Sequence, residues 1–119
     1  MQYMMMFFEP ATTFAERDDP SRAPDYWGAW KAYIDSLVSS GAMVSGNGLE
    51  PPSTATTVRL ANGERLVQDG PAAATKEQLG GYVVLDVADL DAALTWAARC
   101  PAAASGAVEV RPVMPSPSA

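Results

Sequence analysis

Asp69-Gly70-Pro71 opens a segment that ends at Gly80-Gly81-Tyr82 and places a turn, a group of charges and two glycines before an apolar run. Glycine tolerates positive φ and proline holds φ near one value, so Asp69-Gly70-Pro71 predicts an abrupt change of chain direction. The apolar run from Tyr82 to Val87 is typical of a strand buried on both faces. The segment therefore predicts a tight turn, a charged loop and then a buried strand.

The residues just before this turn predict a hairpin. Residues 56–60 are rich in β-branched side chains, and Asn62-Gly63 is a strong signal for a tight hairpin turn. Residues 64–68 then form the returning strand and lead into Asp69.

The first third of the chain predicts a strand, a helix and a second strand. Residues 3–8 are apolar on both alternating faces, and a polar loop follows from Glu9 to about Arg22. We expect a helix over residues 24–40, ended by Gly41 in a left-handed cap, and a short strand over residues 42–45. Apolar side chains recur along this helix at Trp27, Trp30, Ile34, Leu37 and Val38.

The last third predicts a helix and a final strand. Asp89 is suited to cap a helix that runs to about Arg99 and is terminated by Pro101. Residues 107–113 form the last strand, and residues 114–119 are expected to be a disordered tail. The apolar stripe of this helix consists of Leu90, Ala93, Leu94 and Ala97.

The order of these elements predicts one α+β domain over residues 1–113. Strand, helix, strand, hairpin, strand, helix, strand is the ferredoxin-like split βαβ pattern with an inserted β-hairpin. Such a sheet carries both helices on one face, yet residues 3–8 and 82–85 are apolar on both faces. A second copy packed sheet to sheet would cover the other face, so we expect a homodimer.

Composition excludes several classes of protein. The net charge is −6, and the eight basic residues form no patch, so we expect no direct contact with nucleic acid. No segment is long enough to span a membrane and no signal peptide is evident, which predicts a cytoplasmic protein. Cys100 is the only cysteine and histidine is absent, which removes disulfides, histidine metal sites and histidine-based catalytic triads. We expect no metal and no cofactor.

The chain resembles the YCII-related proteins, in the branch named after Asp-Gly-Pro-Phe. Besides Asp69-Gly70-Pro71, the segments at residues 48–52, 55–59, 89–101 and 108–113 are similar to the family pattern and stand in its order. The resemblance implies a dimeric α/β barrel of ferredoxin-like subunits.

The chain also departs from the family pattern. Ala72 and Ala74 stand where the family usually has Phe and Glu, and Trp30 stands where some relatives have a histidine that pairs with an aspartate. The acid–base chemistry of those relatives therefore does not transfer to this chain.

Five residues are candidates for a site. Asp69 could bind a ligand or exchange a proton as a catalytic residue, or its carboxylate could accept hydrogen bonds from its own turn. Lys76 lies in the following loop, where it could face an anionic ligand or solvent. Glu109 and Arg111 should point to the sheet face opposite the helices, into a pocket or into water. Trp30 belongs to the core or to a pocket wall.

Three functions remain open at this point. The first is a dimeric protein that binds a small molecule in a pocket beside the open sheet face. The second is a lyase or isomerase with Asp69 as the general acid or base. The third, drawn from the resemblance alone, is a regulatory interaction protein linked to sigma-factor systems. The missing histidine and the alanine at position 74 favour binding over catalysis, and enzymatic activity stays open.

Overall fold

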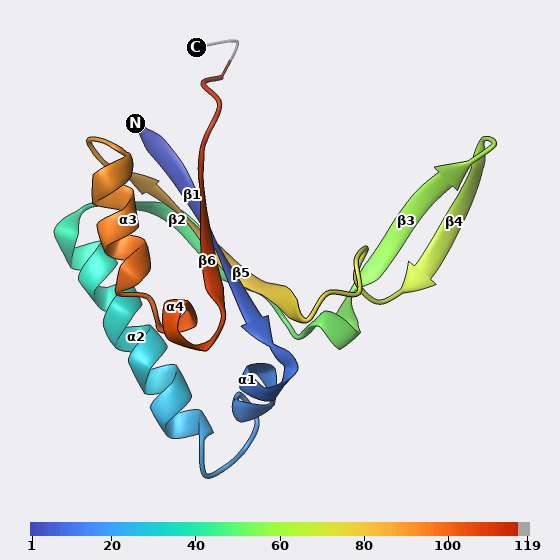
Figure 1. Cartoon of the computed structure of the whole chain (residues 1–119), viewed down its shortest axis with the longest axis horizontal. Helices are drawn as coiled ribbons and strands as arrows, with labels where there is room; N and C mark the ends of the chain where they lie inside the picture. The colour runs from blue at the N-terminus through green and yellow to red at the C-terminus, as the bar shows by residue number, and fades with distance from the viewer. Residues whose placement is uncertain (117–119) are drawn as a thin grey trace.

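The computed structural model describes residues 1–116, so the expected tail over residues 114–119 lies partly outside the described residues. Its centre is a four-stranded antiparallel sheet with the strand order β2-β5-β1-β6 (Figure 1). The strands are β1 (Gln2–Pro10), β2 (Met43–Gly48), β5 (Glu77–Asp86) and β6 (Ala107–Pro112).

Two longer helices cover one face of this sheet (Figure 1). They are α2 (Ala23–Ser40) and α3 (Leu90–Ala98). Three short elements, α1 (Ala11–Glu16), η1 (Pro52–Thr54) and α4 (Pro101–Ser105), lie in the connections. No helix among residues 1–116 is both long enough and apolar enough to cross a membrane.

The core lies between the sheet and the helices. Alternate residues of β1 are buried there, because successive side chains of a strand point to opposite faces. Burial continues along β5, where Val83 and Leu85 are almost fully buried. The buried cluster consists of Met5, Phe7, Tyr33, Leu37, Val83, Leu85, Ala97, Cys100 and Ala102.

The structure confirms both predicted helices and their caps. Gly41 ends α2 with φ of 79°, and the Asp89 carboxylate accepts a 2.9 Å hydrogen bond from the amide of Ala92 at the start of α3. The apolar stripe of α2 differs from the prediction, since Tyr33 is buried and Val38 is 61% exposed. Val38 lies about 100° around the helix from Leu37, which turns it away from the sheet.

The predicted polar loop over residues 9–22 is partly wrong. β1 continues through Glu9 to Pro10, and α1 follows directly. α1 forms because one helical turn buries Thr13 and Phe14 against the end of the sheet. Pro101 also begins the short helix α4 rather than only ending α3, since proline at the first helical position costs no hydrogen bond.

β5 begins five residues earlier than the apolar run indicated. It starts at Glu77 and passes through Gly80 and Gly81, two residues that weaken a strand by propensity. Gly80 is the extra residue of a bulge, because Phe7 pairs with Gly81 while Phe8 pairs with Leu79. The glycines are thus required by close contacts and not by a turn.

The predicted hairpin is confirmed and forms a separate two-stranded sheet. β3 (Thr56–Ala61) pairs with β4 (Glu64–Asp69), and the turn has positive φ at both Asn62 and Gly63, 52° and 79°. Figure 1 shows this hairpin projecting from the body of the protein; residues 56–69 are named the hairpin arm below. The radius of gyration, 16.2 Å, exceeds the roughly 13.5 Å of a compact domain of this length.

The second face of the four-stranded sheet is not covered by α2 or α3. It carries Met4, Met6 and Phe8 of β1, all partly exposed. Met6 pairs with Tyr82 on one side and with Glu109 on the other, and Met4 pairs with Val84 and Arg111. This surface is named the open sheet face: Met4, Met6, Phe8, Tyr82, Val84, Glu109 and Arg111.

Candidate functional site: a pocket between helix α2 and strands β2 and β5

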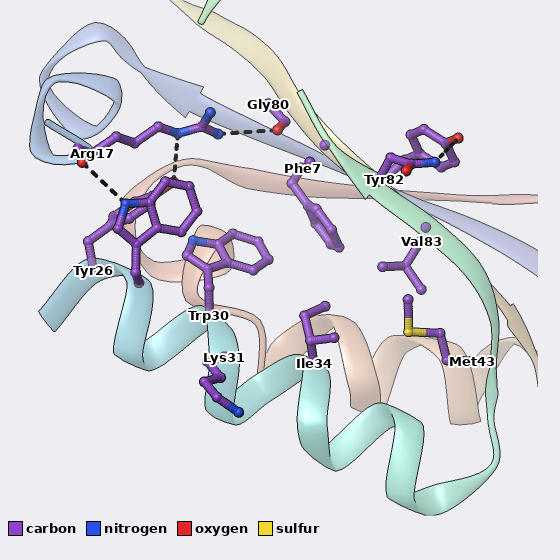
Figure 2. A pocket seen from close by; sticks show the side chains of 15 residues that line it. Phe7, Arg17, Tyr26, Trp30, Lys31, Ile34, Met43, Gly80, Tyr82 and Val83 are labelled. Carbon is purple, nitrogen blue, oxygen red and sulfur yellow. Dashed lines mark hydrogen bonds between the residues drawn. The ribbon is translucent and has the colours of Figure 1, made fainter. Parts of the chain in front are cut away.

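A pocket of about 490 Å³ lies between α2 and the strands β2 and β5, and it is named the α2–β5 pocket (Figure 2). Its walls are mainly aromatic and aliphatic, and its polar groups stand at one end and at the rim. The apolar lining consists of Phe7, Trp27, Trp30, Ile34, Met43 and Val83. The polar side chains of the lining are Arg17, Tyr26 and Lys31, and Asn47 and Tyr82 border the pocket while their side chains lie on the open sheet face.

Four glycines line the strand side of the pocket and leave it open. Gly46 and Gly48 belong to β2, and Gly80 and Gly81 belong to β5. A Cβ on Gly46 would lie 2.8 Å from the carbonyl oxygen of Tyr82, and one on Gly81 would lie 3.1 Å from that of Asn47. The lack of side chains at these four positions leaves the strand side of the pocket open.

Arg17 holds the polar end of the pocket together. Its guanidinium donates from Nη1 to the carbonyl oxygen of Leu49 at 2.6 Å and from Nη2 to that of Gly80 at 3.2 Å. Nε donates to the Tyr26 hydroxyl at 3.3 Å, and Nη2 also contacts Glu9 Oε1 at 3.5 Å. One side chain thus joins β1, β5, α2 and the segment after β2. The rigid fork of a guanidinium suits this role, which a lysine ammonium would not fill.

The buried Glu9 carboxylate pairs with this arginine. Its two oxygens lie 2.9 and 3.0 Å from the Tyr26 hydroxyl, which donates its proton to the carboxylate. Burial, followed by the neighbouring Glu9, raises the pKa of Tyr26 to about 12, and the hydrogen bond from Arg17 opposes that rise. Tyr26 therefore stays a neutral phenol at physiological pH and presents its hydroxyl at the pocket wall.

Trp30 forms the centre of the helix wall. Its ring lies 4.9 Å from that of Phe7 and 6.1 Å from that of Tyr33, centroid to centroid. Its indole nitrogen Nε1 is buried and has no hydrogen-bond partner among residues 1–116. Figure 2 shows this nitrogen on the side of the ring that faces Arg17 and Tyr26. A buried donor without an acceptor costs stability.

The rim of the pocket carries an ion pair on the exposed surface of α2, where Lys31 Nζ lies 2.6 Å from Asp35. On the open sheet face, Asn47 donates from Nδ2 to the Tyr82 hydroxyl at 2.9 Å, across β2 and β5.

The structure places one of the five predicted site residues, Trp30, in this pocket. Asp69 is exposed at the end of β4, where the hairpin arm joins the body, and Lys76 is exposed in the loop before β5. Glu109 and Arg111 lie together on the open sheet face, with an ion-pair distance of 4.0 Å and both side chains more than half exposed. The structure therefore brings Glu109 and Arg111 together, and places Asp69 and Lys76 elsewhere.

Glu9, Arg17 and Tyr26 were not predicted as site residues. Glu9 and Arg17 fell in the segment expected to be a polar loop. One signal was present in the sequence, because a carboxylate directly after six apolar strand residues is unusual unless it has a buried partner. The identity of that partner depends on how α1 folds back on the sheet.

Cys100 is a structural residue in this fold. It is buried in the core, and burial raises the pKa of its thiol to about 12, against the effect of two backbone amides at α4. The part of the chain that the structure describes contains no group of three or more Cys, Asp or Glu side chains arranged to hold a metal ion.

Three comparisons place this chain among known proteins. The family model for the YCII-related domain matches residues 1–117. Uncharacterized protein R00369 of Rhizobium meliloti (strain 1021) is 46% identical over 67 residues, which cover 55% of this chain and 54% of that protein. The match thus spans about half the length of this curated relative.

A solved structure has a similar fold. It is the 5-chloro-2-hydroxyhydroquinone dehydrochlorinase (TftG) from Burkholderia phenoliruptrix AC1100, in complex with 2,5-dihydroxybenzoquinone. The TM-score is 0.55 at 14% identity, and the alignment covers 96% of this chain and 94% of that one. At this identity the likeness shows a shared mixed α/β fold only. Because the family model covers nearly the whole chain, the protein belongs to the YCII-related family.

Proposed function

We propose that the protein binds a small, flat and largely apolar molecule in the α2–β5 pocket, through an oxygen that accepts hydrogen bonds. The observation that carries this proposal is an apolar cavity of about 490 Å³ with the Arg17 guanidinium at its polar end. A guanidinium can only donate, so the ligand must bring an acceptor. Small-molecule sites are commonly built in this way, with a few polar groups in an apolar pocket.

The polar end of the pocket is suited to an electron-rich oxygen. Arg17 has five N–H groups, and its contacts with Tyr26, Leu49, Gly80 and Glu9 use four of them. One N–H on Nη1 remains. The Glu9 carboxylate offsets most of the positive charge of Arg17, so a partially negative oxygen suits this end better than a fully charged group.

The aromatic walls favour a planar ligand. Trp27, Trp30 and Phe7 present ring surfaces to the cavity, and aromatic rings pack well in offset or edge-to-face contacts. The quinone 2,5-dihydroxybenzoquinone, bound by the dehydrochlorinase of similar fold, has the required flat ring and acceptor oxygens. Hydroxylated aromatics and quinones are therefore the ligand class that we propose.

Isothermal titration with 2,5-dihydroxybenzoquinone tests this function. We expect saturable binding with one site per chain and a dissociation constant in the micromolar to millimolar range, as is common for small ligands. A non-aromatic diol of similar size serves as the control, since it keeps hydroxyl groups and lacks the planar ring. Equal binding of the two compounds, or no binding of either compound or of related hydroxyquinones, would overturn the proposal.

We propose further that the active unit is a homodimer of ferredoxin-like subunits in a dimeric α/β barrel. The sheet order β2-β5-β1-β6 is the one that a split βαβ arrangement produces, which supports this architecture. The open sheet face carries three adjacent apolar side chains of β1, Met4, Met6 and Phe8, which a second copy would cover. A cytoplasmic location stays a prediction.

A lyase or isomerase is the alternative. Tyr26 favours it, because its neutral phenol lines the pocket and could exchange its hydrogen bond to Glu9 for proton donation to a bound oxygen. Asp69 stays a candidate acid or base, at a site that the hairpin arm would have to help form. Chloride release from 5-chloro-2-hydroxyhydroquinone, compared between the wild type, Asp69→Asn and Tyr26→Phe, tests this alternative. A regulatory role with a sigma-factor system stays a prediction, tested by pull-down from expressing cells.

A further inference from the structure

The hairpin arm presents apolar side chains on both of its faces. Val58 and Val67 pair directly across the two strands on one face, and Leu60 lies on the same face. Leu66 lies on the other face, opposite Arg59. Val58, Leu60, Leu66 and Val67 are each more than half exposed.

A two-stranded hairpin of this kind is only marginally stable alone in water. The arm is nevertheless firmly attached at its base. The amide of Gly70 donates to the carbonyl oxygen of Ala55 at 2.7 Å, Thr57 Oγ1 donates to that of Gly70 at 2.7 Å, and Arg59 Nη2 donates to that of Ala72 at 2.9 Å. The arm is thus held in one direction while its apolar faces lack a partner within residues 1–116.

The arm and the open sheet face lie on the same side of the molecule. In Figure 1 the sheet is seen along its edge, with α2 and α3 on one side of it and the hairpin arm extending on the other. A molecule packed on the open sheet face would therefore lie beside the arm. One partner can cover both apolar surfaces at once.

The area of the open sheet face is too small for a stable dimer by itself. The strands β1, β2, β5 and β6 have nine, six, ten and six residues, and at about 4.8 Å between strands and about 3.3 Å per residue they cover on the order of 500 Å². One face of the arm covers about 200 Å² on the same basis. A typical stable interface needs about 800 Å² per partner. The open sheet face, the arm, and an equal area that receives the partner's arm together reach this value.

We infer that the hairpin arm is a dimerisation arm, which lies against a second copy of this chain with Val58, Leu60 and Val67 in the contact. In a two-fold dimer each arm grips the other subunit, so every copy contributes the same two surfaces. This inference rests on the homodimer of the proposed function, and adds to it a second contact that the sheet alone does not provide.

Sedimentation velocity over a concentration series tests the arm with two matched variants. Val58→Lys places a charge in the middle of the arm, and Val38→Lys places the same charge on α2, at a valine exposed to a similar degree. Both side chains are 58–61% exposed in the single chain, so neither variant should disturb the subunit itself. We expect Val58→Lys to raise the dimer dissociation constant at least tenfold and Val38→Lys to change it less than twofold.

The outcomes separate this inference from the proposed function. If the wild type forms dimers and Val58→Lys dimerises equally well, the inference is wrong and the homodimer stands. A wild type that stays monomeric at all concentrations overturns both the homodimer and the arm. If dimers form and depend on Val58 while 2,5-dihydroxybenzoquinone and its relatives do not bind, the arm is supported and the proposed ligand is wrong. Hydrogen exchange at residues 56–69 adds a second readout, because these amides should lose protection on dilution.

Discussion

Arg17 and Gly80 are in such close contact that a side chain at position 80 would have to displace its neighbours by a few tenths of an ångström. Nη2 of Arg17 donates to the carbonyl oxygen of Gly80 at 3.2 Å, and a Cβ built on Gly80 would lie 3.0 Å from the same nitrogen. The Cβ would also lie 3.0 Å from the ring of Phe14 and 3.1 Å from Oε1 of Glu9. The bulge at Gly80 thus brings β5 against the buried ion pair.

Gly80→Ala should therefore destabilise the protein by about 1–3 kcal/mol, because the added methyl group meets a packed guanidinium, a ring and a carboxylate. Gly28→Ala is the control, since Gly28 lies inside α2 with no atom within 4 Å of a built Cβ. That variant should gain about 0.5–1 kcal/mol from helix propensity. Urea unfolding measures both, and equal stability of the two variants would contradict the tight contact at Gly80.

Tyr26→Phe should reduce the fall in unfolding free energy that the protein shows at alkaline pH. The pKa of Tyr26 is raised from 10.0 to about 12 in the folded protein, so the contribution of its neutral hydroxyl is complete below pH 10 and is lost as the pH rises towards 12. Between pH 10 and pH 12 the Tyr26 hydroxyl is ionised in the unfolded chain but still protonated in the folded protein, so the free energy of unfolding falls as the pH rises. The difference in unfolding free energy between wild type and Tyr26→Phe should shrink over this range. Cys100 and Tyr33 are present in both proteins and cancel in the comparison. A constant difference from pH 8 to pH 12 would refute the raised pKa.

Trp30→Phe should weaken binding of 2,5-dihydroxybenzoquinone about tenfold, which is about 1.4 kcal/mol, because the smaller ring leaves part of the helix wall of the pocket without contact to the ligand. Trp96→Phe is the matched control. Trp96 packs beside Tyr33, with 6.4 Å between ring centroids, and does not line the α2–β5 pocket. Titration calorimetry should show unchanged affinity for Trp96→Phe, and similar losses in both variants would indicate a general effect on the fold.

Met6→Lys should prevent dimerisation through the open sheet face. Met6 lies between Tyr82 and Glu109 in the centre of that face, where a lysine would be exposed to water in the single subunit and would lose that hydration against the apolar side chains of a second copy in the dimer. Met114→Lys is the control, since Met114 is 85% exposed after β6. Light scattering should give a monomer for Met6→Lys and the wild-type mass for Met114→Lys. A dimer in both cases would place the interface elsewhere.

Asp69→Ala should leave stability unchanged within about 0.5 kcal/mol, because the carboxylate is exposed and has no hydrogen bond within residues 1–116. Its effect on the affinity for 2,5-dihydroxybenzoquinone should be less than twofold, since Asp69 does not line the pocket. Titration of the variant measures this. A tenfold loss of affinity would show that the base of the arm forms part of the binding site in the assembled protein.

The secondary structure was largely predictable because its signals are local. Helical spacing of apolar residues before Gly41, the cap at Asp89 and the turn at Asn62-Gly63 each depend on neighbours in sequence, and all three are confirmed. The facing of β6 was also predictable, since Val108 and Val110 pack on the core and Glu109 and Arg111 lie on the other face. Successive side chains of a strand point to alternate faces of the sheet, so one residue known to be buried fixes the face of every other residue in the strand.

The polar end of the pocket was not predictable from local signals. Glu9, Arg17 and Tyr26 lie within 18 residues of one another, yet their contact requires α1 to fold back over the end of β1. The close approach of β2 and β5 that excludes side chains at Gly46 and Gly81 also involves residues far apart in sequence. Long-range contacts of this kind leave little pattern along the chain.

The class of fold, the positions of most helices and strands, and membership of the YCII-related family were predictable from the amino-acid sequence. These properties depend on periodicity, caps and turn residues, which act over a few residues. The location of the pocket, the side chains around it and the buried indole donor of Trp30, which has no acceptor among residues 1–116, became evident only in the folded protein. Burial and hydrogen-bond satisfaction are properties of packed surfaces, which exist only once distant segments have come together.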